Sequence, residues 1–175
     1  MATTLDRITV TALPGHPSLG RLEAGSRVIR CALGRGGIGH GKREGDGVTP
    51  AGVHPLRRLW YRDDRHPRPP TALPVRRIGA RDGWCDAPGD RNYNRHVRLP
   101  YVGSHEAMRR TDGLYDHVVE IGFNDARRVQ GGGSAIFLHV ARPGFLPTEG
   151  CIAIAPDEFR KLLPRLGPRT RLVVR

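Results

Sequence analysis

The chain has 175 residues, a length that fits one ordinary domain able to bury a hydrophobic core. It carries 29 lysines and arginines against 17 aspartates and glutamates, which gives a formal net charge of +12 without long blocks of one sign. The 23 glycines and 15 prolines fall between short apolar runs and form no repeat, so they indicate turns and exclude a low-complexity chain. We therefore expect a single domain over residues 1–175.

The excess of basic residues implies attraction to polyanions such as nucleic acid, anionic lipid or wall polymers. Aromatic residues are too sparse and scattered for the stacking platforms of single-strand binders, so we expect no nucleic-acid partner. The N-terminus lacks the apolar run of a signal peptide, and no stretch approaches the ~18 apolar residues of a membrane span. We expect a soluble monomer, while a basic binding module without enzymatic activity remains the rival interpretation.

Three cysteines, Cys31, Cys85 and Cys151, stand at wide spacings in the chain. Their odd number argues against a disulfide framework, and the absence of a CxxC pair argues against a zinc site. We therefore expect neither a metal nor a cofactor, and at least one free thiol.

Alternating polar and apolar residues predict strands over residues 8–13 and 27–33 in the first third of the chain. Residues 34–52 form a glycine-rich connection between them and the next strand. Three further segments are predicted in order: an extended stretch at 53–60, a proline-rich exposed loop at 62–74 and an irregular segment at 81–102.

The second half begins with Ser104 and Glu106 before Ala107, a pattern that predicts an N-capped short helix over 104–110. Pro156, followed by two acidic residues, predicts a second helix that ends at Pro164. Apolar runs predict the remaining strands, which are 117–123, 135–140, 151–155 and 171–174. The sum is a mainly antiparallel β-sandwich or barrel with two short helices.

Two glycine motifs suggest a nucleotide site but lack its structural context. Residues 34–39 match GxGxxG, and residues 36–42 match GxxxxGK, yet both fingerprints need a following helix that holds the phosphates. Glycines and Pro50 within 42–52 exclude such a helix, and Arg43 stands where a phosphate loop requires Ser or Thr. We interpret both matches as chance.

His139 ends the segment 133–139, and Cys151 opens the apolar run 151–155, with eleven residues between the two. Such a histidine and cysteine can form the hydrogen-bonded pair of thiol catalysis, since a thiol with a pKa of about 8.5 is only weakly ionised at neutral pH. Gly150 allows the backbone to bend, so that the N–H groups of Gly150 and Cys151 can point at an oxyanion. The residues alone leave open a small buried cysteine beside a core histidine.

The reactive pair resembles the signature of the L,D-transpeptidase (YkuD-type) family, a histidine and a loop followed by [Ser/Thr]-x-Gly-Cys, carried here by His139, Thr148, Gly150 and Cys151. The turn Gly47-x-Thr49-Pro50-x-Gly52 is similar to a second landmark of that family. Three further segments resemble its short proteobacterial branch, namely 83–86, 93–95 and 104–106. The resemblance spans roughly residues 40–175 and implies a mainly β, YkuD-like sandwich or barrel with two or more short helices.

Three positions decide which features of the family pattern can be expected in this chain. Glu149 stands where the family usually has histidine, and Ala153 stands where it usually has Asn or Arg. Both would lie by the substrate cleft, so the choice of acyl acceptor does not follow from the resemblance. Val140 follows the histidine, and its backbone carbonyl is expected to orient the imidazole, a role that any side chain tolerates.

The resemblance implies a cysteine acyltransferase that acts on peptidoglycan stem peptides through a thioester. Resolution by an amine gives a 3-3 or a 1-3 cross-link, and resolution by water gives an L,D-carboxypeptidase or endopeptidase. The substrate class implies a periplasmic location, although the sequence shows no signal peptide. Arg142 and Arg95 are candidates for stem carboxylates, because guanidinium groups match carboxylates. The other candidate substrate-binding residues are Thr148, Glu149, Ser134, Tyr115 and Trp84.

Overall fold

The computed structural model describes residues 3–175, and most of their regular structure is β-strand. In chain order the strands are β1 (Arg7–Leu13), β2 (His16–Ala24), β3 (Arg27–Ala32), β4 (Ile38–Gly39), β5 (Thr49–Pro50), β6 (Gly52–Tyr61), β7 (Val75–Arg77), β8 (Asp82–Cys85), β9 (Arg95–Arg98), β10 (His105–Ala107), β11 (His117–Ile121), β12 (Phe137–Val140), β13 (Ile152–Ile154) and β14 (Arg171–Val174). The helical segments are η1 (Pro143–Phe145), α1 (Pro156–Leu162) and η2 (Leu163–Arg165). None of the helices in residues 3–175 is long and apolar enough to cross a membrane.

The main sheet closes on itself through its longest strand, β6. Its order is β11-β12-β13-β3-β2-β1-β14-β6-β7, with an additional pairing of β6 with β11. The first residues of β6 pair with β14, and the residues from Leu56 to Tyr61 pair with β11. A barrel-like sheet results, in which most neighbours are antiparallel and three pairs, β1–β14, β12–β13 and β6–β7, are parallel.

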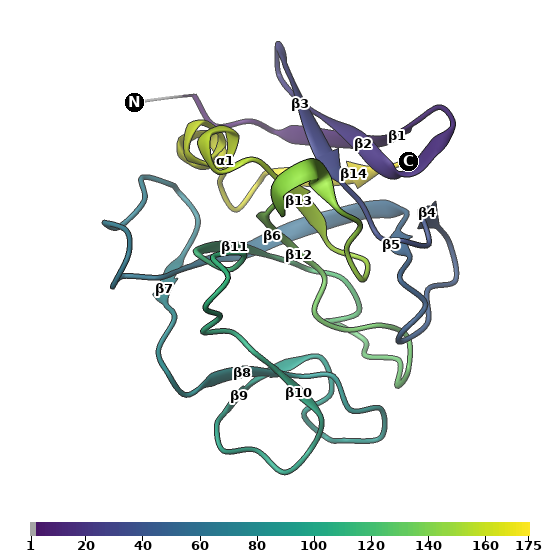
Figure 1. Ribbon diagram of the computed structural model, residues 1–175, viewed down its shortest axis with the longest axis vertical. Coiled ribbons are helices and arrows are strands. Elements are labelled where there is room, and N and C mark those ends of the chain that lie inside the picture. The colour runs from purple at the N-terminus through teal and green to yellow at the C-terminus, as the bar shows by residue number, and fades with distance from the viewer. Residues whose placement is uncertain (1–2) are drawn as a thin grey trace.

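The interior of this closed sheet holds the larger apolar cluster. Alternate residues of its strands point inward, among them Val10, Leu22, Leu138 and Ile154, all of them buried. Phe159 of α1 and two leucines at its end join the same cluster, so the helix covers one end of the sheet (Figure 1). Pro156 starts the helix, and Asp157 and Glu158 occupy its first turn, which suits the positive end of the helix dipole.

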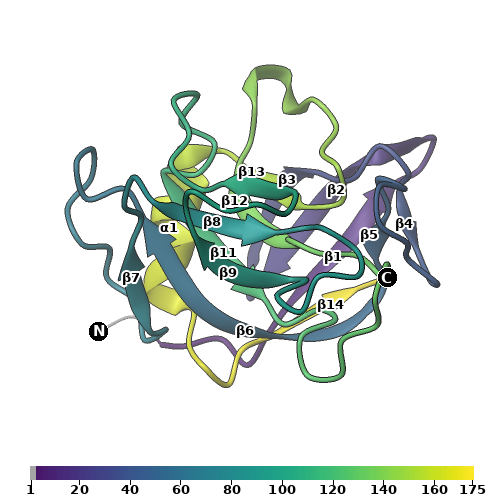
Figure 2. The same cartoon turned by 90° about the horizontal axis from the view of Figure 1, so that it is seen from below.

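A separate sheet, ordered β10-β8-β9, lies against the outer face of β11 and β12 (Figure 2). The layer between the two sheets is a second apolar cluster, formed by Trp60, Ile78, Trp84, Met108, Leu114, Tyr115, Val118, Phe137 and Cys151. On β12 the side chains alternate, so that Leu138 and Val140 enter the larger cluster while Phe137 enters the second. Both faces of β12 are therefore covered, which explains its almost wholly apolar sequence.

The sequence predicted most of the main sheet correctly. The strands expected at 8–13, 27–33, 53–60, 117–123, 135–140, 151–155 and 171–174 are present as β1, β3, β6, β11, β12, β13 and β14. The helix expected from Pro156 is α1, and the mainly β fold class is confirmed.

Two predictions in the middle of the chain were wrong. Residues 104–110 contain strand β10 and no helix, because His105 and Ala107 pair with β8, and this pairing outweighs the local capping pattern. The described residues therefore contain one α-helix in place of two. The segment 81–102 is not irregular as a whole, since β8 and β9 pair within it through a register that joins Gly83 to Val97. The strands β2 and β7 were not predicted, and neither were the two-residue strands β4 and β5 within the glycine-rich connection.

Candidate active site

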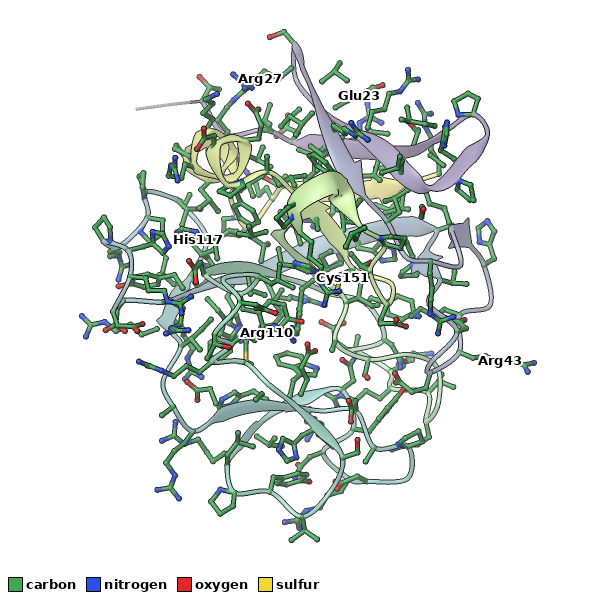
Figure 3. The ribbon with its side chains drawn as sticks, in the orientation of Figure 1. Glu23, Arg27, Arg43, Arg110, His117 and Cys151 are labelled. Atoms are coloured by element: carbon green, nitrogen blue, oxygen red, sulfur yellow. The ribbon has the colours of Figure 1, made fainter. Side chains whose placement is uncertain are left out.

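A cavity of about 440 Å³ opens between the main sheet and the smaller sheet. Cys151 and His139 line it from the main sheet, and Asp86, His105 and Glu106 line it from the smaller one. In Figure 3, Cys151 lies near the middle of the molecule, with Arg110 below it toward the smaller sheet. The two sheets thus form opposite walls of one cavity.

The thiol of Cys151 is held by two backbone groups of the chain that leads into β12. Its Sγ accepts a hydrogen bond from the Phe137 N–H at 3.4 Å and donates to the Ala135 carbonyl at 3.2 Å. The side chain is buried, with 8% of the residue exposed. These contacts fix the sulfur at the floor of the cavity, one residue before β13 begins.

His139 is buried in β12, opposite Ala153 of the parallel strand β13. Its Nδ1 lies 2.8 Å from the Val140 carbonyl oxygen, and because a carbonyl only accepts, Nδ1 carries the proton. Nε2 of the neutral ring is then a bare acceptor. The ring of Tyr115 packs edge-on against the imidazole at 5.4 Å between centroids. No hydrogen bond joins His139 to Cys151 in residues 3–175; the two share the cavity as separate neutral groups.

Burial keeps both groups uncharged. Burial and, after it, the negative charge of Glu106 raise the pKa of Cys151 to about 12, against the Phe137 N–H that lowers it. Burial lowers the pKa of His139 to about 4, although the hydrogen bond to the Val140 carbonyl opposes this shift. At neutral pH the resting pair is therefore thiol and neutral imidazole.

Glu106 brings a half-buried carboxylate to the wall opposite Cys151. The Tyr115 hydroxyl donates to it at 2.6 Å, and burial raises its pKa. Arg110 lies 3.5 Å from the same carboxylate, but its shorter contacts, of 2.5 and 3.0 Å, are with Asp112. Sequence reasoning missed Glu106 and Arg110 because it assigned both to a helix.

Hydrogen bonds of Thr148 stabilise the connection between His139 and Cys151. Its hydroxyl donates to the Cys151 carbonyl at 2.6 Å and accepts from the Gly150 N–H at 3.2 Å. Gly150 has φ +126°, and a Cβ there would lie 2.7 Å from the Val48 carbonyl oxygen, so only glycine fits without movement. The glycine-rich connection therefore packs directly behind the cysteine.

That connection also supplies Glu44 to the cavity wall. The hydroxyls of Tyr93 and Ser134 donate to its carboxylate at 2.5 and 2.7 Å. Nearby, the Thr49 hydroxyl accepts a hydrogen bond from the Gly34 N–H at 2.8 Å. This bond holds the turn over residues 47–52 against Gly34. The glycine motif considered for nucleotides is thus a structural support of the cavity.

The structure brings together most of the residues singled out in the sequence. The cavity is lined by Cys151, His139, Tyr115, Ser134, Arg142, Thr148 and Glu149. Arg95 and Trp84 lie elsewhere, at a second recess, because the Trp84 indole turns toward Phe137 and donates to the Asn94 side chain at 3.0 Å. Glu149 is largely exposed and pairs with Arg35 at 2.9 Å.

The remaining cysteines lie outside the cavity. Cys31 and Cys85 are buried free thiols, and burial raises the pKa of Cys31 to about 12. Among residues 3–175, no group of three or more His, Cys, Asp or Glu side chains is placed to hold a metal ion.

The family model of the YkuD L,D-transpeptidase catalytic domain matches residues 18–174. Because this match spans most of the chain, the protein belongs to the YkuD family of L,D-transpeptidase catalytic domains. A comparison with curated proteins gave no match. Among solved structures, the chain is similar to L,D-transpeptidase 1 of Mycobacterium tuberculosis, with 14% identity and a TM-score of 0.39 over 96% of this chain and 61% of that one. The chain thus spans less than two thirds of that relative's length.

Proposed function

We propose that the protein is a peptidoglycan L,D-transpeptidase in which Cys151 is the nucleophile and His139 its base. The observation that carries this proposal is the neutral pair in one cavity, with Nδ1 of His139 committed to the Val140 carbonyl and Nε2 left to accept a proton. Membership of the YkuD family supports the same reaction class.

Acylation begins when the thiol turns from the Ala135 carbonyl toward Nε2 of His139. The imidazole takes the thiol proton, and the sulfur attacks the carbonyl carbon at the L-centre of an L,D-peptide bond. The backbone N–H of Cys151 is the candidate donor to the resulting oxyanion, and the N–H of Gly150 can join it when it leaves the Thr148 hydroxyl. The imidazolium then protonates the departing amine, so a D-amino acid leaves and a thioester remains on Cys151.

Deacylation repeats the sequence with a new nucleophile. An amine of a second stem loses its proton to His139 and attacks the thioester carbonyl, and the cysteine sulfur leaves as a thiol. A side-chain amine of diaminopimelate gives a 3-3 cross-link, and a stem-terminal alanine amine gives a 1-3 cross-link. Water gives hydrolysis by the same route.

The charges of the cavity suit a substrate that carries both ammonium and carboxylate groups. Arg142 forms no ion pair within residues 3–175, so its guanidinium is available to a stem carboxylate. Four carboxylates line the same cavity, those of Glu44, Asp86, Glu106 and Glu149. They favour binding of an ammonium group, as an amine acceptor carries before it is deprotonated.

The test is reaction of the purified protein with tetrapeptide stems, followed by separation and mass analysis of the products. A dimeric muropeptide supports transpeptidation, and its linkage names the acceptor. A product without any cross-link, formed only by loss of the terminal residue, assigns hydrolysis instead. No product with the native protein would overturn the proposal.

Covalent labelling by a carbapenem provides an independent test of the nucleophile. Intact mass should show one adduct on the native protein and on Cys31→Ala, and none on Cys151→Ala. Cys31→Ala is the matched control, because both thiols are buried and have a raised pKa. An adduct that survives Cys151→Ala would contradict the assignment. The substrate implies a periplasmic location, which fractionation of a tagged full-length protein would test.

A further inference from the structure

A second recess, of about 260 Å³, lies beside the smaller sheet and shares no lining residue with the cavity of Cys151. Its floor is apolar and includes Ile121, Phe123, Ile136 and the edge-to-face pair of Trp84 and Phe137, whose ring centroids are 5.1 Å apart. Its rim is strongly basic, with four arginines and two carboxylates. No step of the proposed reaction uses this recess.

Two of the four arginines are neutralised within the fold. Arg57 makes two contacts with Asp125, at 2.7 and 3.3 Å. Arg58 lies 3.0 Å from Glu120, which also accepts the Trp60 indole N–H at 3.1 Å. Both carboxylates of the recess are thus already engaged.

The guanidinium groups of the other two arginines, Arg95 and Arg128, have no carboxylate within 4.0 Å among residues 3–175, and neither guanidinium donates a hydrogen bond there. Nε of Arg128 is fully buried and lacks a hydrogen-bond partner within the described chain. A buried donor without a partner is costly, and a ligand oxygen would satisfy it. Arg95 and Arg128 line the same small space, and burial and the charge of Arg95 lower the pKa of Arg128, against Asp125, which raises it.

We propose that this recess is a binding site for a small oxyanion, a carboxylate or a phosphate, held by Arg95 and Arg128 above the apolar floor. Guanidinium groups donate in a planar fork that matches both kinds of oxyanion, and an anion would relieve the repulsion between the two arginines. The site is separate from the catalytic cavity and does not depend on the reaction proposed for Cys151.

The experiment is an NMR titration that follows the indole N–H signal of Trp84, which lines the recess. Sodium phosphate and sodium acetate are added separately to the full chain at constant ionic strength. A saturable shift with phosphate alone, acetate alone or both supports the site and names the anion. No saturable shift with either anion would overturn it.

Three variants locate the binding. Arg95→Gln and Arg128→Gln should each weaken the anion about tenfold or more, because each removes one charged donor pair. Arg127→Gln removes the same charge from an exposed neighbour that does not line the recess, and should leave the affinity unchanged within about twofold. Equal affinity in all three variants would assign the shift to general charge and overturn the proposal. Arg95 is exposed, so its variant keeps the test valid if Arg128→Gln does not fold.

Discussion

Nδ1 of His139 donates to the carbonyl oxygen of Val140, the next residue on β12, at 2.8 Å. A backbone group therefore selects the tautomer of the imidazole, and no side chain is needed for this task. The geometry of β12 therefore determines that Nε2 is the nitrogen that can accept a proton.

Replacement of His139 by Ala should lower kcat/KM for stem peptides by about 100- to 10 000-fold, because the thiol then loses the base proposed for it. Steady-state kinetics on purified stems provides the measurement. Val140→Ala is the matched control, since it keeps the carbonyl while truncating a core side chain. It should retain kcat/KM within a few-fold and lower the free energy of unfolding by roughly 1–3 kcal/mol. A loss of catalysis in Val140→Ala as deep as that of His139→Ala would contradict the role of the carbonyl.

Glu106→Gln should lower the pKa of the Cys151 thiol, because the carboxylate is the largest cause of its elevation after burial. The expected result is faster alkylation by iodoacetamide at pH 8, by about 3- to 10-fold, which corresponds to a shift of up to one unit. The reaction at Cys151 can be followed by peptide mass analysis. Glu149→Gln is the control, because Glu149 lines the same cavity but is largely exposed and paired with Arg35. An equal acceleration in both variants would refute a specific effect of Glu106.

Stability should fall as the pH is lowered from about 6.5 to about 4. Burial lowers the folded-state pKa of His139 and His117 to about 4, so the unfolded chain binds more protons in this window, and the free energy of unfolding rises with pH. Each histidine should contribute a loss on the order of 2 kcal/mol by pH 5. Urea unfolding at pH 7 and pH 5 measures the effect, and His117→Asn should reduce the difference. A stability that is constant between these two pH values would contradict the depressed pKa values.

Gly150→Ala should destabilise the fold and displace Cys151. The residue has φ +126°, and the added Cβ would meet the Val48 carbonyl at 2.7 Å, so the cost should exceed about 2 kcal/mol. Gly144→Ala is the matched control, with φ +76° in the same connection and no atom within 4 Å of its Cβ, and should cost only about 1 kcal/mol. Thermal unfolding and carbapenem labelling measure stability and the position of the thiol. Similar costs at the two positions would show that the contact with Val48 is unimportant.

The strands of the main sheet were predictable because their apolar residues are dictated by burial on one or both faces. β12 is an example, since Phe137 and Leu138 enter different clusters and the run is apolar throughout. The smaller sheet was not predictable in this way. β10 is three residues long and owes its conformation to pairing with β8, which a local capping pattern at Ser104 cannot reveal.

The same difference applies to the candidate site. Cys151 and His139 stand beside apolar runs, so their approach followed from the order of two strands. Glu106 enters the cavity from a strand that was predicted as a helix, and Trp84 leaves it through its contact with Phe137. Which wall a side chain joins is decided by the register of the smaller sheet, and that register has no signal in a single sequence.

The cavity has two walls of different origin, and under the proposed function this division separates reactivity from substrate selectivity. The sulfur and the imidazole belong to the closed main sheet, whose geometry depends on many long-range pairings. His105 and Glu106 belong to a small sheet formed by one continuous stretch of chain between β7 and β11, and Asp86 directly follows its strand β8. Replacement of the chain between β7 and β11 by another sequence would change the charge and shape of one cavity wall. The positions of the Cys151 sulfur and the His139 imidazole would stay the same. Under the proposed function, the reacting groups and the wall that contacts the rest of the substrate are therefore separate parts of the fold.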